Sequence, residues 1–280
     1  QLNPNKAIIT SMESDHLDIY GNVDRLKASF EQFARQSVQV VVHQSLSELL
    51  DHPNMVTYGI NEGDYSAGNI QAEAGVVRFT ISHHGKEILS SEISLPGQYN
   101  IENATAAAGC ALEAGIDPSV VAGALKSFTG IKRRFEYVLK TPNTIFLDDY
   151  AHHPSEIRAF ISGVRQMYPD KKLLVIFQPH LYSRTNDFAE GFAKELDKSD
   201  EVILMPIYPA REKPIPGVGS EMIRELMQKE VTIVEKENLV LELKNRSFDV
   251  LATVGAGDID QQVNPIRSYL KEHDEAETKT

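Results

Sequence analysis

The sequence has no tryptophan, a single cysteine and no long run of apolar residues. One cysteine cannot form a disulfide within the chain, which is typical of proteins from a reducing compartment. No stretch approaches the roughly 18–20 consecutive apolar residues of a membrane-spanning helix, so we expect no membrane span. The first residues also lack the basic segment and apolar core of a signal peptide. These absences predict a cytoplasmic protein.

Basic residues are outnumbered, with 28 Lys and Arg against 40 Asp and Glu, and the net charge is −12. Such a chain repels a phosphate backbone, so we expect no nucleic-acid partner. The sequence shows no sign of an obligate protein partner either, which leaves small molecules as the expected partners. The length of 280 residues is enough for one large or two ordinary domains, and a hydrophobic content of 41% is that of an ordinary globular protein.

A complete phosphate-binding loop is absent as well. Gly85-Lys86 resembles the end of one, but Thr80 stands where the first glycine belongs and Glu87 where Ser or Thr belongs. Alternating apolar residues precede and follow this dipeptide, in Val76–Ile81 and Glu87–Leu95. The pattern favours a β-hairpin whose turn uses Gly85 at positive φ.

The first part of the chain mixes strand and helix patterns. Short apolar runs predict strands at Ala7–Thr10 and Val38–His43, and helical spacing of apolar residues predicts a helix over Val23–Arg35. An alanine-rich helix is expected over Ile101–Ala114. Asp117-Pro118 then provides an N-cap and a first-turn proline for another helix. The lone Cys110 lies in the alanine-rich helix, where a buried small side chain is favoured over a reactive thiol.

After Gly130 strands and helices alternate regularly, which predicts a parallel sheet with helices on both faces. We place a domain boundary there, giving domains 1–130 and 131–280. The strands are expected at Thr144–Leu147, Lys172–Phe177, Glu201–Pro206, Val231–Val234 and Val250–Val254. The helices are expected at Pro154–Met167, Asp187–Leu196 and Ser220–Gln228.

Polar residues follow four of these strands, the first three and the last, and the carboxyl ends of parallel strands meet at one edge where ligands bind. We therefore expect one site at this edge. The residues concerned are Asp148, Asp149, Tyr150, His152, His153, Gln178, His180, Arg184, Tyr208, Arg211, Gly255, Gly257 and Asp258.

Several of these residues have structural alternatives. Asp148 and Asp149 could be loop carboxylates or a helix cap, and His152-His153 could simply begin a helix. Arg184 suits an anion at a helix start, but it could also form a surface salt bridge. Gly255-Ala256-Gly257 is a poor dinucleotide fingerprint, because Asp260 replaces the third glycine. In the first domain, Glu13–Asp18 could hold a divalent cation or form a capping box.

Taken in order, these motifs resemble those of the Mur ligase family, the ATP-dependent amino-acid ligases of bacterial cell-wall synthesis. The resemblance rests on segments spread over nearly the whole chain: Ser14–Gly21, Leu95–Ala104, Arg133–Phe135, Asp148–Pro154, Phe177–Thr185, Tyr208–Gly217 and Gly255–Asp258. It implies an α/β fold in which part of a central ATP-binding domain precedes a doubly wound, mostly parallel carboxy-terminal domain. The family's phosphate loop and amino-terminal domain are not in the 280 residues, so a fragment that is inactive alone is expected.

The resemblance also implies an activity. ATP and Mg²⁺ would be used to join L-alanine to UDP-N-acetylmuramate through an acyl phosphate. A non-catalytic module that binds a nucleotide or a nucleotide-sugar is the alternative.

Site residues are implied in the same way. His16 resembles the family's metal ligand, and Asn100 and Asn103 resemble the residues that read adenine. Arg134 resembles the arginine that reaches the ATP phosphates, and Asp149 the aspartate on the ribose.

Tyr150, His152, His180 and Arg184 resemble the cluster that holds the acceptor and the muramoyl end. Arg134, His152 and His180 are the expected catalytic residues. Two positions depart from the family pattern. Tyr99 stands where many members have His, and Leu181 stands where many have Arg, which removes one cation from the cluster.

Overall fold

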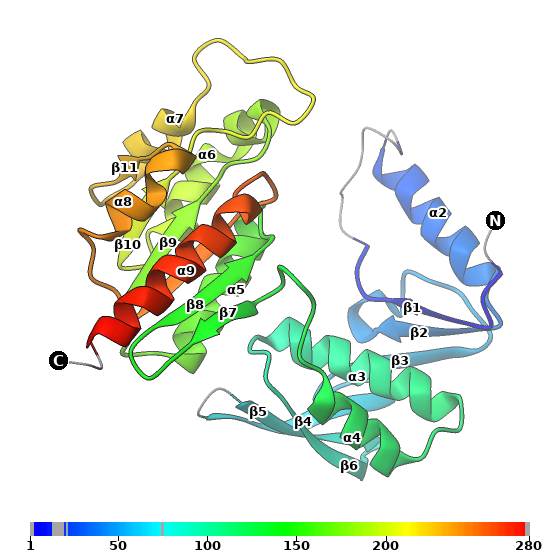
Figure 1. Cartoon of the computed structure of the whole chain (residues 1–280). Helices are drawn as coiled ribbons and strands as arrows, with labels where there is room; N and C mark the ends of the chain where they lie inside the picture. Colours follow the sequence, from blue (N-terminus) through cyan, green and yellow to red (C-terminus); the bar gives the residue numbers. More distant parts are fainter. Residues whose placement is uncertain (1–2, 13–19, 21, 74–75, 278–280) are drawn as a thin grey trace. The chain divides into compact units, whose positions relative to one another are not determined.

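The computed structural model describes residues 3–12, 20, 22–73 and 76–277 (Figure 1). The chain forms two compact units, Gln1–Thr129 and Gly130–Thr280, and each is described by itself. Within the described residues, no helix is both long enough and apolar enough to cross a membrane.

The first unit is built on a six-stranded sheet with the strand order β1-β2-β3-β4-β5-β6. The first four strands pair in parallel, and the last three form an antiparallel meander. Their bounds are β1 Lys6–Ile9, β2 Gln39–His43, β3 Met55–Ile60, β4 Tyr65–Glu73, β5 Val76–His83 and β6 Lys86–Ile93. The expected hairpin joins β5 to β6, with Gly85 at φ +78°.

Helices cover this sheet, as Figure 1 shows for α2 (Val23–Arg35), α3 (Gln98–Glu113) and α4 (Pro118–Ser127). Ala34, Phe30 and Phe33 of α2 pack with apolar residues of β1 and β2, and α3 lies along β2, β3 and β4. A short 3₁₀ helix, Gln44–Leu46, follows β2. Asp117 caps α4 as expected, accepting a hydrogen bond from the Ser119 N–H at 2.8 Å.

The second unit contains the doubly wound sheet that the sequence predicts, with the order β11-β10-β9-β12-β8-β7. All pairings are parallel except that of β7 with β8. The chain crosses the sheet in one direction from β7 to β11 and then returns, so that β12 is inserted between β8 and β9. The bounds are β7 Glu136–Lys140, β8 Ile145–Asp149, β9 Leu173–Phe177, β10 Glu201–Leu204, β11 Thr232–Ile233 and β12 Val250–Val254.

Helices lie on both faces of this second sheet (Figure 1). Residues of α8 (Leu239–Leu243) and α9 (Asp260–Glu277) share one core with Phe146, Leu174 and Leu251. On the other face are α5 (Pro154–Met167), α6 (Tyr182–Leu196) and α7 (Ser220–Leu226). A short 3₁₀ helix, Lys236–Asn238, precedes α8. The apolar strands are almost fully buried because both faces are covered.

The fold class is therefore confirmed, but some elements differ from expectation. The strand expected at Thr144–Leu147 continues through Asp149, because Asp148 and Asp149 both pair with β12 in the sheet. The helix expected from Asp187 begins at Tyr182, so the polar residues around Arg184 form its first turn. Strands β3 and β7 were not among the expected elements. Cys110 lies in α3 as expected, but its side chain is only partly buried.

Candidate functional site

The expected polar residues of the second unit do converge on one edge of its sheet, at the carboxyl ends of β8, β9, β10 and β12. Tyr150 and His152 follow β8, and His180 follows β9. His180 forms an isolated parallel bridge to Tyr208, which follows β10. This edge includes the place where β12 separates β8 from β9, the position at which open parallel sheets form their ligand crevice.

Hydrogen bonds lock the ends of β9 and β12 together. The Gln178 side chain donates to Asp258 Oδ1 at 2.7 Å and accepts from the Ile259 N–H at 2.9 Å. Lys236 donates to the other oxygen of Asp258 at 3.0 Å. A β-carbon on Gly257 would lie 2.3 Å from Gln178 Oε1. The glycine is therefore required for close packing of the strand ends, and Gln178 and Asp258 have structural roles.

Four of the expected site residues form a continuous cluster. The rings of Tyr150 and His152 are 5.3 Å apart, and those of His152 and His180 are 6.1 Å apart. Arg184, in the first turn of α6, places its Nη1 3.3 Å from His180 Nδ1. The Tyr208 ring stacks on His180 at 5.7 Å. We call Tyr150, His152, His180 and Arg184 the strand-end cluster.

Hydrogen bonds define the tautomers of both histidines. His152 Nδ1 lies 2.9 Å from the Tyr150 carbonyl oxygen, which can only accept, so this nitrogen carries a proton. His180 Nδ1 faces the Arg184 guanidinium, which can only donate, so this nitrogen is an acceptor. Neutral His180 therefore has its proton on Nε2. The cluster thus presents a donating Nδ1 on His152 and an accepting Nδ1 on His180, the latter beside one guanidinium.

Leu181, the position that departs from the family pattern, has a structural role through its backbone. It immediately precedes α6 with φ +73°, a conformation unusual for a branched side chain. Its N–H donates to the Tyr208 carbonyl at 2.9 Å, and its carbonyl accepts from the Thr185 hydroxyl at 2.9 Å. These contacts fix the turn that joins His180 to Arg184.

Two glutamates that sequence reasoning did not single out orient the cluster. Glu156 Oε2 accepts from the backbone N–H groups of His152 and His153, at 2.9 and 3.2 Å. Glu212 accepts from the backbone N–H of Ser183 at 3.0 Å and from its hydroxyl. A signal for Glu156 was available, because a glutamate three residues into a helix is half of a capping box. His153 itself packs against Phe188 at 4.6 Å and is a helix-start residue.

Burial and the neighbouring positive charge of Arg184 lower the pKa of His180, with a smaller contribution from His152 and opposition from Glu212. The neutral imidazole is therefore favoured in the folded protein. Because the folded pKa lies below the unfolded value, this group makes the protein less stable as pH falls below about 6.5.

Replacing Arg184 with methionine should raise the pKa of His180, since it removes the guanidinium beside Nδ1. The measurement is a pH titration of the imidazole ¹⁵N and ¹H shifts. Lys194→Met, an exposed change farther along α6, should leave the His180 titration where it is. An unchanged His180 pKa in Arg184→Met would show that the contact does not govern this histidine.

Arg133 and Arg134 lie in a turn with an unusual backbone, Ile131–Phe135. Arg133 has φ +60° and Phe135 has φ +49°, so left-handed residues flank Arg134 on both sides. The Arg133 side chain is 18% exposed and bonds to Asp148 Oδ2 at 3.1 Å, whereas the Arg134 side chain is 51% exposed. Both guanidiniums lie over the Tyr150 ring, at 5.1 and 5.5 Å from its centroid. Of the two arginines, Arg134 is the one available to a ligand.

Asp148 and Asp149 are neither loop carboxylates nor a helix cap, since both are buried in β8. Asp148 accepts from the Thr253 hydroxyl at 2.6 Å as well as from Arg133. Asp149 accepts from the backbone N–H groups of Phe135 at 2.7 Å and Ala151 at 2.8 Å. Burial raises the pKa of Asp148, and it raises the pKa of Asp149 to about 6 despite these bonds. The ribose contact implied for Asp149 stays a prediction.

In the first unit, the residues implied for adenine lie at the start of α3. The Asn103 side chain is exposed, so its carboxamide keeps a donor and an acceptor for the edge of a base. Asn100 is partly buried and donates to the Pro96 carbonyl at 2.7 Å. Asn100 and Asn103 lie three residues apart in α3, so their side chains are on the same side of the helix.

The implied magnesium ligand, His16, lies outside the described residues, as does the whole segment Glu13–Asp18. Among the residues that the structure does describe, no group of three or more His, Cys, Asp or Glu side chains could hold a metal ion.

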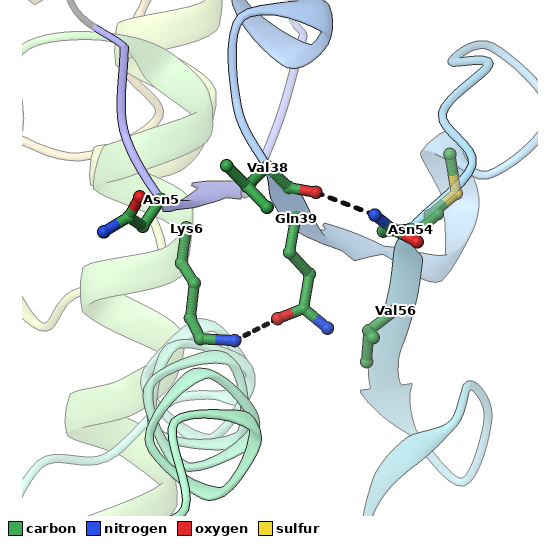
Figure 2. A pocket seen from close by; sticks show the side chains of 7 residues that line it. Asn5, Lys6, Val38, Gln39, Asn54 and Val56 are labelled. Carbon is green, nitrogen blue, oxygen red and sulfur yellow. Dashed lines mark hydrogen bonds between the residues drawn. The ribbon is translucent and has the colours of Figure 1, made fainter.

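The first unit has a pocket beside the amino ends of β1, β2 and β3 (Figure 2). Figure 2 shows Lys6 directed at Gln39 and Asn54 bonded to the Val38 carbonyl. The Gln39 amide in turn donates to Glu113 at 2.8 Å. These polar groups satisfy one another, so we do not assign this pocket to the candidate site.

Comparison with known proteins matches both units to one family. Residues 1–111 match the Mur ligase middle domain, and residues 133–258 match the glutamate ligase domain of Mur ligases. The chain belongs to the Mur ligase family.

Individual relatives narrow the similarity further. The chain is 42% identical to UDP-N-acetylmuramate–L-alanine ligase of Cytophaga hutchinsonii over 95% of its length, and 41% identical to that of Porphyromonas gingivalis over 96%. It resembles the crystal structure of UDP-N-acetylmuramate–alanine ligase MurC from Thermotoga maritima with a TM-score of 0.83 and 31% identity, covering 97% of this chain and 60% of that one. The chain spans 59% and 61% of the two curated relatives.

Proposed function

We propose that this chain is the larger part of an ATP-dependent ligase that joins L-alanine to UDP-N-acetylmuramate in peptidoglycan precursor synthesis. The observation that carries the proposal is the 42% identity to ligases of that name over nearly the whole chain. The strand-end cluster supports it, because it supplies cationic and polar groups at the edge where such a fold binds ligands.

In the proposed reaction, a muramate carboxylate oxygen attacks the γ-phosphorus of ATP, and ADP leaves. The neutral amine of L-alanine then attacks the acyl carbon and loses a proton to water, and inorganic phosphate leaves with the electron pair of the C–O bond. Both steps concentrate negative charge, so fixed cations and hydrogen-bond donors provide the catalysis. No covalent protein nucleophile is required.

The proposed roles are those that the resemblance to the family implies for these positions. Arg134 contacts the ATP phosphates, and Asn100 and Asn103 read the adenine. His152 and His180 act on the reacting groups. The ribose contact implied for Asp149 is left out of the proposed roles, because this residue is 4% exposed and each of its oxygens accepts a backbone N–H group.

Tyr150 and Arg184 complete the cluster that holds the muramoyl end and the acceptor amino acid. Mg²⁺, held in part by His16, would neutralise phosphate charge when bound. We place the reaction in the cytoplasm, with small molecules as the only partners.

The test is an assay of phosphate release with ATP, Mg²⁺ and UDP-N-acetylmuramate, with and without L-alanine. The full-length protein should release phosphate only when L-alanine is present. The 280-residue chain alone should not, because it contains no phosphate loop.

Two results would contradict the proposal. Adenine-nucleotide binding without turnover in the full-length protein would identify a non-catalytic binding module. Turnover by the 280-residue chain alone would show that a phosphate loop elsewhere is not needed.

A further inference from the structure

The turn that carries Arg134 is held in a conformation that its own residues do not favour. Left-handed backbone is unfavourable at a non-glycine residue, because its β-carbon comes too close to the following carbonyl oxygen, and both Arg133 and Phe135 adopt it. Such a backbone persists only where the surrounding structure compensates. The contacts that compensate are found on the neighbouring strand ends.

Asp149 supplies the first compensation through the backbone. Its Oδ2 accepts from the Phe135 N–H on one side, and its Oδ1 accepts from the Ala151 N–H on the other. The side chain is thus a bridge between the turn and the segment that begins the strand-end cluster. The Tyr150 N–H adds a third link, donating to the Arg133 carbonyl at 2.7 Å.

Asp148 supplies the second compensation through a side chain. It holds the Arg133 guanidinium at 3.1 Å, and that guanidinium also donates to the Gly255 carbonyl at the end of β12. Asp148 is itself fixed by the Thr253 hydroxyl at 2.6 Å. The turn is therefore anchored to both β8 and β12, on either side of Arg134.

We propose that Asp148 and Asp149 are positioning residues that fix the Ile131–Phe135 turn and so set the place of the Arg134 guanidinium. Asp149 acts through the backbone N–H groups of Phe135 and Ala151, and Asp148 acts through Arg133. The inference rests on the proposed function in one respect, namely that Arg134 contacts ATP. It gives Asp149 a different role from the ribose contact that the family resemblance implies.

Asp149→Asn is the most specific substitution for this test, because asparagine has the same shape as aspartate and changes its hydrogen bonding. Its carboxamide has one accepting oxygen, and its nitrogen can only donate. One of the two backbone N–H groups must then face another donor, so the bridge is broken on one side. The exposed Asp170→Asn in the turn after α5 makes the same chemical change without a bridge to break.

The experiment is a double-mutant cycle in the full-length protein, using Asp149→Asn, Arg134→Ala and the pair. We expect Asp149→Asn to lower kcat/KM for ATP about 10–100-fold, as for a misplaced catalytic group. In the Arg134→Ala background the same change should alter kcat/KM less than about twofold, because the group it positions is gone. Asp170→Asn should match the parent in both backgrounds.

A second readout separates positioning from a ribose contact. The ratio of kcat/KM for ATP to that for 2′-deoxy-ATP should be the same in Asp149→Asn as in the parent. A ratio that falls towards one in Asp149→Asn would overturn the inference and support direct ribose binding. So would a double variant whose loss of kcat/KM equals the product of the two single losses.

Arg133→Lys provides a second route should Asp149→Asn fail to fold. Lysine keeps the charge but cannot reach Asp148 and Gly255 with separate nitrogens in the way a guanidinium does. It should also lower kcat/KM for ATP, and again only when Arg134 is present. An effect of Arg133→Lys that persists in the Arg134→Ala background would refute the positioning role of Asp148. If Arg134→Ala alone leaves kcat/KM for ATP unchanged, the assigned role of Arg134 fails instead.

Discussion

Arg134→Ala should lower kcat/KM for ATP by about 10²–10³-fold in the full-length protein, the loss typical of removing one preorganised donor to a developing charge. The side chain is half exposed, and its partners are the Tyr150 ring and a 3.8 Å contact to Glu156. Exposed ion pairs of this kind contribute about 0–1 kcal/mol to stability. The change should therefore remove activity and leave folding almost intact.

The measurement is steady-state kinetics with ATP as the varied substrate, paired with urea unfolding. Arg158→Ala, which removes an exposed arginine from α5, is the matched control and should retain parental kinetics. Equal losses in both variants would point to a general effect of positive charge rather than a contact made by Arg134.

Arg133→Met should also lower the stability of the fold, with a loss of about 3–5 kcal/mol in the free energy of unfolding at pH 8, typical of a buried pair that loses one partner. Asp148 is 2% exposed and would keep a buried charge without its guanidinium. The Gly255 carbonyl would also lose its donor. Urea unfolding followed by circular dichroism measures the change.

The deficit of Arg133→Met should shrink as the pH falls. Burial already raises the pKa of Asp148, and the Arg133 charge opposes that rise. Removing the charge raises the folded pKa further above the unfolded value. A group of this kind destabilises the protein above its folded pKa and is relieved by protonation below it. Lys132→Met, at the exposed neighbouring position, should show neither the deficit nor the pH dependence.

Much of the fold followed from the sequence because its patterns are local. Short apolar runs that alternate with helical stretches predicted the second sheet. Asp117-Pro118 predicted a helix start that the structure confirms. The edge strand β7 was missed because it pairs antiparallel with β8 and its side chains are only partly buried. Its residues therefore lack the fully apolar run that marks the central strands.

The candidate site was predictable only in part. Strand-end positions indicated that Tyr150, His152 and His180 would lie near one another, and the structure brings them together. The separate roles of Arg133 and Arg134 could not be inferred from two adjacent identical residues. That distinction depends on left-handed backbone and on a partner from β8, and neither has a signal in the local pattern.

The bridge made by Asp149 has an evolutionary consequence. Its two partners at positions 135 and 151 contribute backbone N–H groups, which every amino acid except proline possesses. Non-proline substitutions at those positions therefore require no compensating change at position 149. An aspartate restrained in this manner would stay fixed over long divergence while showing no correlated variation with the residues it holds.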